Sequence, residues 1–269
     1  MANNRILYLC KEITPYLPEN EESQLCRTLS QAMQERGNDV RTFMPRYGCI
    51  NERRNQLHEV IRLSGMNLII DDNDHQLIIK VASIPSARIQ IYFIDNDDYF
   101  ARKAVLTDAD GKPFADNDER MIFFANGVLE TVKKLHWAPT IVHCHSWFSA
   151  MAPIYLRNVF NDDPLFRDVK IVVSLYNDRF EEPLSKDLKR KIESIGITDE
   201  NLSIIETPSY ENLMRYVIGN ADGIVIASDK ADQATVEFAR GTGKPILEYR
   251  SADEETLFDN YNSFYDELR

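Results

Sequence analysis

Three residues near the middle of the chain, His143, Cys144 and His145, have side chains that can bind a metal or transfer protons. They lie in the stretch TIVHCHSWFSAM, which begins with a short apolar run typical of a strand. Side chains alternate between the two faces of a strand, so the two histidines would share one face and Cys144 would point to the other. A metal site needs further ligands, and the sequence suggests only Asp178 or His136. We therefore expect histidines satisfied by hydrogen bonds, with no metal site and no cofactor.

This stretch belongs to a regular alternation of strand-like and helix-like runs. Short apolar runs predict strands at 5–10, 39–45, 58–63, 76–84, 88–94, 140–145, 170–176, 223–228 and 245–249. Apolar residues at helical spacing predict helices at 21–36, 120–135 and 151–159, and Gly37 marks the end of the first. The alternation predicts an α/β, Rossmann-like fold with a mainly parallel sheet and helices on both faces. No linker divides the chain, so we expect one domain over residues 1–269.

The apolar pattern separates two parts of the expected sheet. The almost continuously apolar strands are those at 5–10, 140–145 and 170–176. Such strands are buried on both faces, so we expect them to be adjacent or nearly adjacent inner strands. The strands that alternate more strongly are those at 58–63, 76–84 and 88–94. We expect these three to form an antiparallel or edge portion. The polar segment 176–208 gives no clear pattern.

The composition limits the classes of partner. The chain has 31 Lys and Arg against 43 Asp and Glu, a formal net charge of −12, so we expect no nucleic-acid binding. No apolar run approaches the roughly 18–20 residues of a membrane span, and the amino terminus lacks the pattern of a signal peptide. We therefore expect a cytoplasmic protein that does not contact a membrane. The cysteines lack the close pairing of zinc ribbons and redox motifs, which predicts free thiols: Cys10, Cys26, Cys49 and Cys144.

Four stretches are similar, in the same order, to bacterial glycogen synthases and plant starch synthases. They are GNDVRTFMPRYG (37–48), DNDERMIFFANGVLE (116–130), TIVHCHSW (140–147) and NADGIVIAS (220–228). The resemblance covers nearly the whole chain and implies one Rossmann-like half of a GT-B glycosyltransferase. It also implies transfer of glucose from ADP-glucose to an α-1,4-glucan between two such halves, with the acceptor held mainly by the amino-terminal half. Arg269 lies about where that half would finish, so we expect the second half to be absent.

The first loop differs from the family pattern. The family opens its first helix with a lysine, a threonine and two glycines, which let backbone amides approach a diphosphate. This chain has YLPENEESQL (16–25), with Glu19, Glu21 and Glu22. These carboxylates would stabilise the helix start through its dipole. At an effective dielectric of ~20, a carboxylate and a like unit charge of a diphosphate 4 Å away repel each other by roughly 4 kcal/mol before salt screening. We therefore expect this loop to bind no diphosphate.

The central stretch also differs from the family pattern. The family reads histidine, aspartate, tryptophan, histidine where this chain reads His145, Ser146, Trp147 and Phe148. In the family the second histidine lies beside the donor glucose. A phenylalanine can neither donate a hydrogen bond nor move a proton. The resemblance therefore implies binding more readily than catalysis at this point, and no catalytic residue is assigned.

We expect the remaining ligand site at the carboxyl ends of the strands, where doubly wound sheets bind ligands. It would combine His145, Ser146 and Trp147 with Tyr176 and Asn177. Trp147 offers an apolar face for a sugar, and the polar side chains offer hydrogen bonds. The resemblance marks Asn177 as a match and Tyr176 as a replacement for a histidine. An unused hollow and a tyrosine that only caps the sheet edge are the alternatives.

Arg120 is a further candidate on the helix motif. It follows Asn117 and Glu119, which also match the family pattern. Its guanidinium would either contact an anionic or sugar ligand or pair with a carboxylate to hold the helix. The sequence leaves both roles open.

The chain is best interpreted as a starch or glycogen synthase-like amino-terminal domain without independent glucosyl transfer, which binds an α-glucan, a sugar nucleotide or another protein. Two alternatives stay open. An active half would transfer glucose from ADP-glucose when completed by a separate carboxy-terminal glycosyltransferase half. A regulatory module would bind a small molecule or a protein in the crevice at the strand ends. The sequence does not decide whether the chain is an enzyme.

Overall fold

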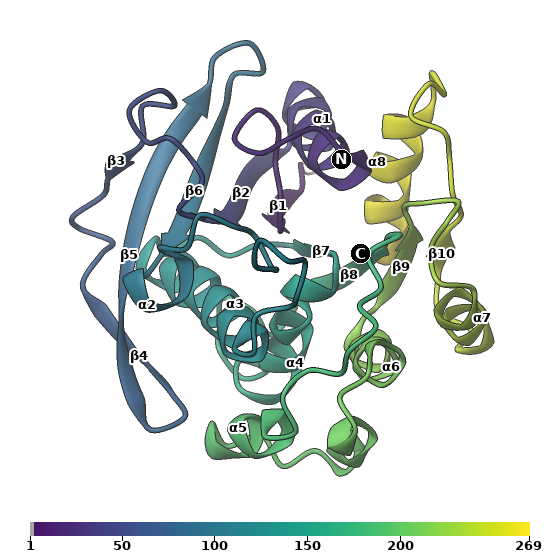
Figure 1. Ribbon diagram of the computed structural model, residues 1–269. Helices are drawn as coiled ribbons and strands as arrows, with labels where there is room; N and C mark the ends of the chain where they lie inside the picture. The colour runs from purple at the N-terminus through teal and green to yellow at the C-terminus, as the bar shows by residue number, and fades with distance from the viewer. Residues whose placement is uncertain (1–2) are drawn as a thin grey trace.

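The computed structural model describes residues 3–269, which form a 10-stranded sheet with helices on both faces (Figure 1). The strands are β1 (Arg5–Leu9), β2 (Asp39–Pro45), β3 (His58–Glu59), β4 (Met66–Ile70), β5 (Asn73–Ile84), β6 (Ile89–Asp95), β7 (Ile141–His145), β8 (Lys170–Leu175), β9 (Gly223–Ile226) and β10 (Ile246–Leu247). The α-helices are α1 (Glu21–Glu35), α2 (Asp97–Phe100), α3 (Asn117–Lys134), α4 (Met151–Asn158), α5 (Leu188–Ser194), α6 (Tyr210–Asn220), α7 (Gln233–Gly241) and α8 (Leu257–Leu268). Short 3-10 helices span Trp147–Ser149 and Glu200–Glu206.

The strand order is β10-β9-β8-β7-β1-β2-β6-β5-β3, with β4 paired to β5. Neighbours from β10 to β6 in this order are parallel, whereas β5 is antiparallel to β6, β3 and β4. β1, β7 and β8 are neighbours and almost fully buried, which confirms the expected inner strands. The expected Rossmann-like, mainly parallel sheet is likewise confirmed.

The antiparallel part differs in detail from the expectation. β6 belongs to both parts, because it is parallel to β2 and antiparallel to β5, and its burial is nearly continuous. The segment 58–63 contributes only the two residues of β3, since the following backbone turns back through hydrogen bonds to the Val60 carbonyl. β4 was not predicted. It forms a hairpin with β5 through Asp71 and Asp72, whose φ angles of 47° and 65° are unusual without a glycine.

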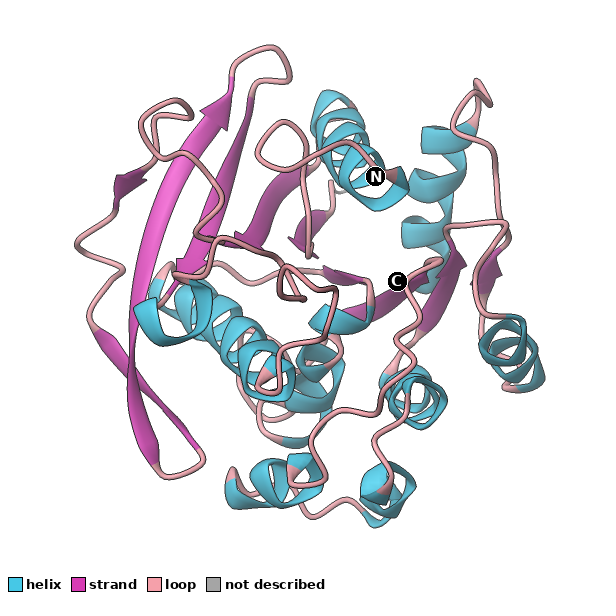
Figure 2. Ribbon diagram, in the orientation of Figure 1, coloured by secondary structure: helices cyan, strands magenta, loops and turns pink. Residues whose placement is uncertain are grey.

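Two helical layers cover the sheet. Figure 2 shows α1 and α8 above one face, and α3, α4 and α6 below the other. α8 returns to the centre of the sheet, where the Tyr265 hydroxyl lies 3.1 Å from Tyr8 Oη and 2.7 Å from His143 Nδ1. The last helix therefore closes the face on which the central histidines lie. No described helix is long and apolar enough to span a membrane.

α1 follows its sequence signals closely. The Asn20 side chain accepts a hydrogen bond from Ser23 N, and Ser23 Oγ accepts one from Asn20 N, which together form a capping box. Leu29 and Met33 lie on the apolar face of the helix and are fully buried. Gly37 follows the helix with φ +86°, a conformation that a residue without a Cβ adopts at little cost. The predicted helix at 21–36 is confirmed.

The connections change direction between β1 and β7. After β1 the chain moves outward through β2 to β6, and after crossing to β7 it moves outward the other way through β8, β9 and β10. The loops after β1 and β7 therefore separate and leave room between them. In doubly wound sheets ligands bind in this crevice, outside the carboxyl ends of the strands.

Candidate functional site

A cavity of about 800 Å³ lies beside the carboxyl ends of β1, β7 and β8. Lys11 follows β1 closely, Trp147 follows β7 and Asn177 follows β8, and all three line the cavity. The opposite wall is the loop 106–115, which precedes α3. Two of the expected site residues, Trp147 and Asn177, therefore share a hollow at the crevice predicted from the topology.

Asp178 ties the ends of β7 and β8 together at this cavity. Its carboxylate accepts hydrogen bonds from Trp147 N at 3.3 Å and from the Tyr210 hydroxyl at 3.2 Å. The Trp147 ring packs edge-on against Phe180, with ring centroids 4.9 Å apart. Asn177 is exposed and its side chain makes no hydrogen bond to any residue in the described part of the chain. The cavity thus combines an aromatic wall with an amide that is free to bind a ligand.

The other central candidates lie beneath the cavity. His145, Ser146 and Tyr176 are buried, and the Tyr176 hydroxyl is 2.7 Å from His145 Nδ1. Ser146 has φ +68° and ψ 161°, a region that residues with a side chain rarely adopt, so the backbone is locally strained. Its hydroxyl accepts a hydrogen bond from Phe148 N. In this structure the three residues lie in the core and do not line the 800 Å³ cavity.

Two of the three cations that line the cavity, Lys11 and Arg179, are already paired with carboxylates, whereas the third, Lys112, is exposed. Lys11 Nζ lies 3.0 Å from the Glu22 carboxylate, and burial raises the pKa of Glu22 to about 7 while the Lys11 ammonium opposes that rise. Arg179 donates hydrogen bonds to Glu211 and Asp232, both at 2.8 Å. Neither cation is therefore free to neutralise a diphosphate.

The first loop is organised by its own acidic residues. Glu22 is turned inward, where its carboxylate accepts a hydrogen bond from Lys11 N at 3.2 Å. Glu19 and Glu21 remain exposed, so two of the three expected carboxylates face solvent and the third is held inside. Asn20 already caps the start of α1. The loop presents negative charge and a satisfied helix end, and its inability to bind a diphosphate stays a prediction.

Arg120 does not belong to the cavity, contrary to the ligand-binding alternative. It is fully buried at the start of α3, where Nε donates to the Tyr99 carbonyl at 2.8 Å and Nη1 donates to Asn117 Oδ1 at 2.7 Å. Its guanidinium also lies over the Phe100 and Phe114 rings, 5.3 Å from each centroid. The residue holds the helix, as the second alternative expected, but through a carbonyl, an amide and aromatic faces rather than a carboxylate.

His143 is satisfied by hydrogen bonds, as expected, but the same expectation is wrong for His145, whose buried Nε2 has no partner in the described part of the chain. The Nδ1 of His143 pairs with the Tyr265 hydroxyl at 2.7 Å and its Nε2 with the Ser174 hydroxyl at 2.6 Å. Burial, together with the neighbouring His145, lowers the pKa of His143 well below its ordinary value, so the ring is neutral. Both nitrogens are occupied and His136 is exposed, so the metal-ligand set considered from the sequence is not assembled.

Sequence reasoning missed two features of this region. Asp178 was considered only as a distant metal ligand, although it directly follows Asn177 at a strand end and fixes the cavity wall. Cys10 and Cys26 are free thiols, as predicted, but the sequence gives no sign that they lie beside His145. Their separation of many residues in the sequence gave no signal, because one follows β1 and the other lies on α1.

A second cavity, of about 450 Å³, lies between the outer face of α1 and the segment that joins β10 to α8. Its walls include Glu21, Gln24 and Arg27 from α1 and Tyr249 and Phe258 from the opposite side. None of the expected site residues lines it. It is therefore a separate hollow on the α1 side of the molecule.

Comparisons with known proteins identify the family. Residues 5–244 match the family model for the starch synthase catalytic domain. The glycogen synthase of Chlorobium limicola is 38% identical over 176 residues, which cover 65% of this chain and 36% of that protein. The glycogen synthase of Chlorobium phaeovibrioides is 30% identical over 244 residues, covering 82% of this chain and 49% of that protein.

A solved structure shows the same fold. The catalytic domain of starch synthase IV from Arabidopsis thaliana, bound to ADP and acarbose, superposes with a TM-score of 0.72 at 14% identity. The match covers 92% of this chain and 51% of that chain. This chain thus spans about half or less of the length of these relatives. Because the family match extends over residues 5–244, the chain belongs to the glycogen and starch synthase family.

Proposed function

We propose that this domain binds a neutral α-glucan in the 800 Å³ cavity and does not transfer glucose by itself. The charge of the cavity carries the proposal. Its lining includes three cations, Lys11, Lys112 and Arg179, and the three carboxylates Asp178, Glu181 and Glu182. A lining with no net formal charge suits a neutral ligand better than a nucleoside diphosphate.

The aromatic wall supports a sugar ligand. Phe114 and Phe180 line the cavity as partly exposed rings, and Trp147, which is 4% exposed, packs edge to face against Phe180 behind them. Sugar rings have apolar C–H faces that pack against aromatic rings, while their hydroxyls need hydrogen-bond partners. The unpartnered amide of Asn177 and the partly exposed carboxylate of Asp178 supply such groups. The arrangement has the few convergent polar groups of a small-molecule site.

The absence of independent transfer rests on Phe148. This residue stands where the family pattern has a histidine beside the donor glucose, and it is fully buried against Phe124, with ring centroids 5.9 Å apart. It has no proton to give and no route to a ligand. The acidic first loop also disfavours binding of the donor's diphosphate, and Lys11 cannot offset this because it is paired with Glu22.

Glucan binding is tested by titrating maltoheptaose while following Trp147 fluorescence. Replacing Trp137 with phenylalanine removes the other indole, which lies at the far end of the sheet, where its Nε1 donates to Asp39. We expect a saturable change at millimolar sugar in the Trp137→Phe protein. The matched control carries Asn177→Ala as well, and its response should be weaker. No saturable change in a folded protein would overturn the proposal.

Transfer is tested separately with ADP-glucose and glycogen. We expect no glucan extension by the purified chain, and clear turnover would refute the loss of activity. A second arm adds the carboxy-terminal half of a starch synthase catalytic domain, because the match to such a domain covers only 51% of it. Extension only in that arm would favour an active half completed by a partner. A thermal-shift screen of sugars against nucleotides tests the regulatory alternative, since a ligand that binds only the folded state raises stability.

A further inference from the structure

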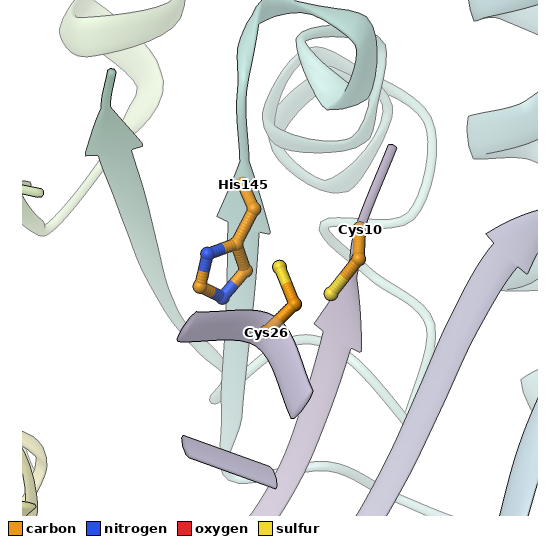
Figure 3. A group of neighbouring side chains, drawn as sticks. All are labelled: Cys10, Cys26 and His145. Carbon is orange, nitrogen blue, oxygen red and sulfur yellow. The ribbon is translucent and has the colours of Figure 1, made fainter. Parts of the chain in front are cut away.

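Two thiols and an imidazole meet beside the carboxyl ends of β1 and β7. Cys10 follows β1, His145 ends β7, and Cys26 lies on α1, which packs across them (Figure 3). Their ligand atoms all lie within 4.8 Å of one another, and each residue is at most 1% exposed. The cluster exists because β1 and β7 are hydrogen-bonded neighbours and α1 covers this face. It is the only such group of metal-binding side chains in the described part of the chain.

His145 is already oriented as metal-bound histidines are. Its Nδ1 is 2.7 Å from the Tyr176 hydroxyl, whereas its buried Nε2 has no hydrogen-bond partner. With Nδ1 protonated and donating to Tyr176, Nε2 carries a free lone pair. Metal-bound histidines commonly use their other nitrogen in such a bond, which fixes the ring. An unpartnered buried polar atom is otherwise costly, so this nitrogen points to an occupant that the other two side chains would share.

We propose that Cys10, Cys26 and His145 form a binding site for a thiophilic divalent cation, with zinc(II) the best match. Two thiolates and a neutral imidazole carry two negative charges, which one divalent cation neutralises. A monovalent cation would leave a net charge in a fully buried place, which is strongly unfavourable. Two cysteines and one histidine are also a known zinc-ligand set, in which the fourth position is open to water.

The geometry requires only small adjustments. With bonds of about 2.0–2.3 Å, the ligand atoms of a tetrahedral zinc lie roughly 3.5–3.8 Å apart. The side chains would therefore close by about an ångström from their present separations of up to 4.8 Å. A smaller cavity of about 190 Å³ is lined by Tyr176, the hydrogen-bond partner of His145, although none of the three proposed ligands lines it.

The remaining cysteines provide matched controls. Cys144 is buried but lies on the opposite face of β7, because neighbouring residues of a strand alternate. Cys49 is exposed and would bind metals non-specifically. All proteins are therefore prepared with Cys49→Ser, reduced and metal-free, and kept under anaerobic conditions. The test variants are Cys10→Ala and Cys26→Ala, and the control is Cys144→Ala.

Zinc is added to these proteins in competition with a coloured chelator, and bound metal is counted after gel filtration. We expect one zinc per chain in the Cys49→Ser parent and in the Cys144→Ala control, and none in either test variant. X-ray absorption at the zinc edge should show two sulfur ligands at about 2.3 Å and nitrogen or oxygen ligands at about 2.0 Å. Tyr176→Phe should retain the site but weaken zinc binding by about 10- to 100-fold. Metal-free melting curves of each variant establish that it is folded.

Three outcomes would overturn the proposal. Zinc retained in folded Cys26→Ala would place the ion elsewhere. If Cys144→Ala lost as much bound zinc as Cys10→Ala and Cys26→Ala, the loss would not be specific to the cluster. Oxidation that removes the Cys10 and Cys26 thiols together, in a parent that binds no zinc, would identify the pair as a disulfide-forming site instead.

Discussion

Lys191 joins α5 to α3 through a buried ion pair whose removal should be costly. Its Nζ lies 2.7 Å from Asp118 Oδ2 and 2.7 Å from Glu119 Oε1. The Asp118 side chain is fully buried, and its other oxygen has no partner. Lys191→Met keeps an unbranched side chain, one heavy atom shorter, and removes the ammonium group that donates to both carboxylates. The buried carboxylate would then have no cation beside it.

The expected loss is about 3 kcal/mol in the free energy of unfolding. Breaking a buried pair typically costs about 3–5 kcal/mol because it leaves one charge uncompensated. The lower end applies because Glu119 is partly exposed and can turn to solvent, so only Asp118 remains buried. Lys189→Met on the same helix is the matched control. Its pair with Glu206 is exposed to solvent and should contribute little to stability.

The pH dependence gives a second signature of the same carboxyl. Burial raises the pKa of Asp118, and Lys191 opposes that rise. Without the lysine the folded-state pKa moves higher still, while the unfolded value stays at about 3.9. A carboxyl whose pKa is raised by folding destabilises the protein as pH increases from the unfolded value through the folded one. The penalty of Lys191→Met should therefore be small near pH 4 and grow towards neutral pH.

Urea denaturation followed by fluorescence measures both effects at pH 5 and pH 7.5. Lys191→Met combined with Asp118→Asn should recover most of the loss at pH 7.5, because the uncompensated charge is gone. A loss below about 1 kcal/mol for Lys191→Met would refute the reasoning, since it would match an exposed pair. An equal loss at both pH values, with no recovery in the double variant, would show that packing and not charge is responsible.

Three further substitutions test other parts of the structure. Gly48→Ala would place a Cβ 2.0 Å from the Ala101 carbonyl oxygen, so we expect a loss of about 1–3 kcal/mol by urea denaturation; an unchanged midpoint would contradict this close approach. Tyr176→Phe removes the partner of His145 Nδ1 in a buried place and should cost about 1–3 kcal/mol in metal-free protein, whereas a neutral effect would show that the ring finds another partner. Asn177→Ala should leave the urea midpoint unchanged and weaken maltoheptaose binding, and unchanged affinity by calorimetry would remove this amide from the site.

The sequence predicted the parts of the fold that depend on local patterns. The apolar runs of β1, β7 and β8 identified the inner strands, and helical spacing with Gly37 identified α1. β4 was missed because its hairpin turns through Asp71 and Asp72 rather than through a glycine, so the usual turn signal is absent. β3 was overestimated because a strand-like pattern does not reveal that the backbone turns back on itself.

Topology predicts where the cavity lies, whereas the binding role of its residues stays a prediction. Topology places the ends of β7 and β8 at one rim, which brought Trp147 and Asn177 to the cavity. Whether a side chain at that rim faces the cavity or the core depends on packing, and His145 faces the core. Arg120 lies inside because aromatic rings from other segments surround it. The approach of Cys26 to His145 depends on how α1 crosses the sheet, which no local pattern encodes.

The central position of β1 has a consequence for the time that folding takes during synthesis. β1 is made before the other strands of the sheet, yet the partner on one of its sides follows about 135 residues later, as the hydrogen bond between Arg5 N and Thr140 Oγ1 shows. At about 5–20 residues per second, the ribosome needs on the order of 10 s to make that partner. For this interval one edge of an almost wholly apolar strand has no neighbour. A nascent chain of this fold therefore depends on protection by chaperones more than a protein whose first strand pairs with the next one alone.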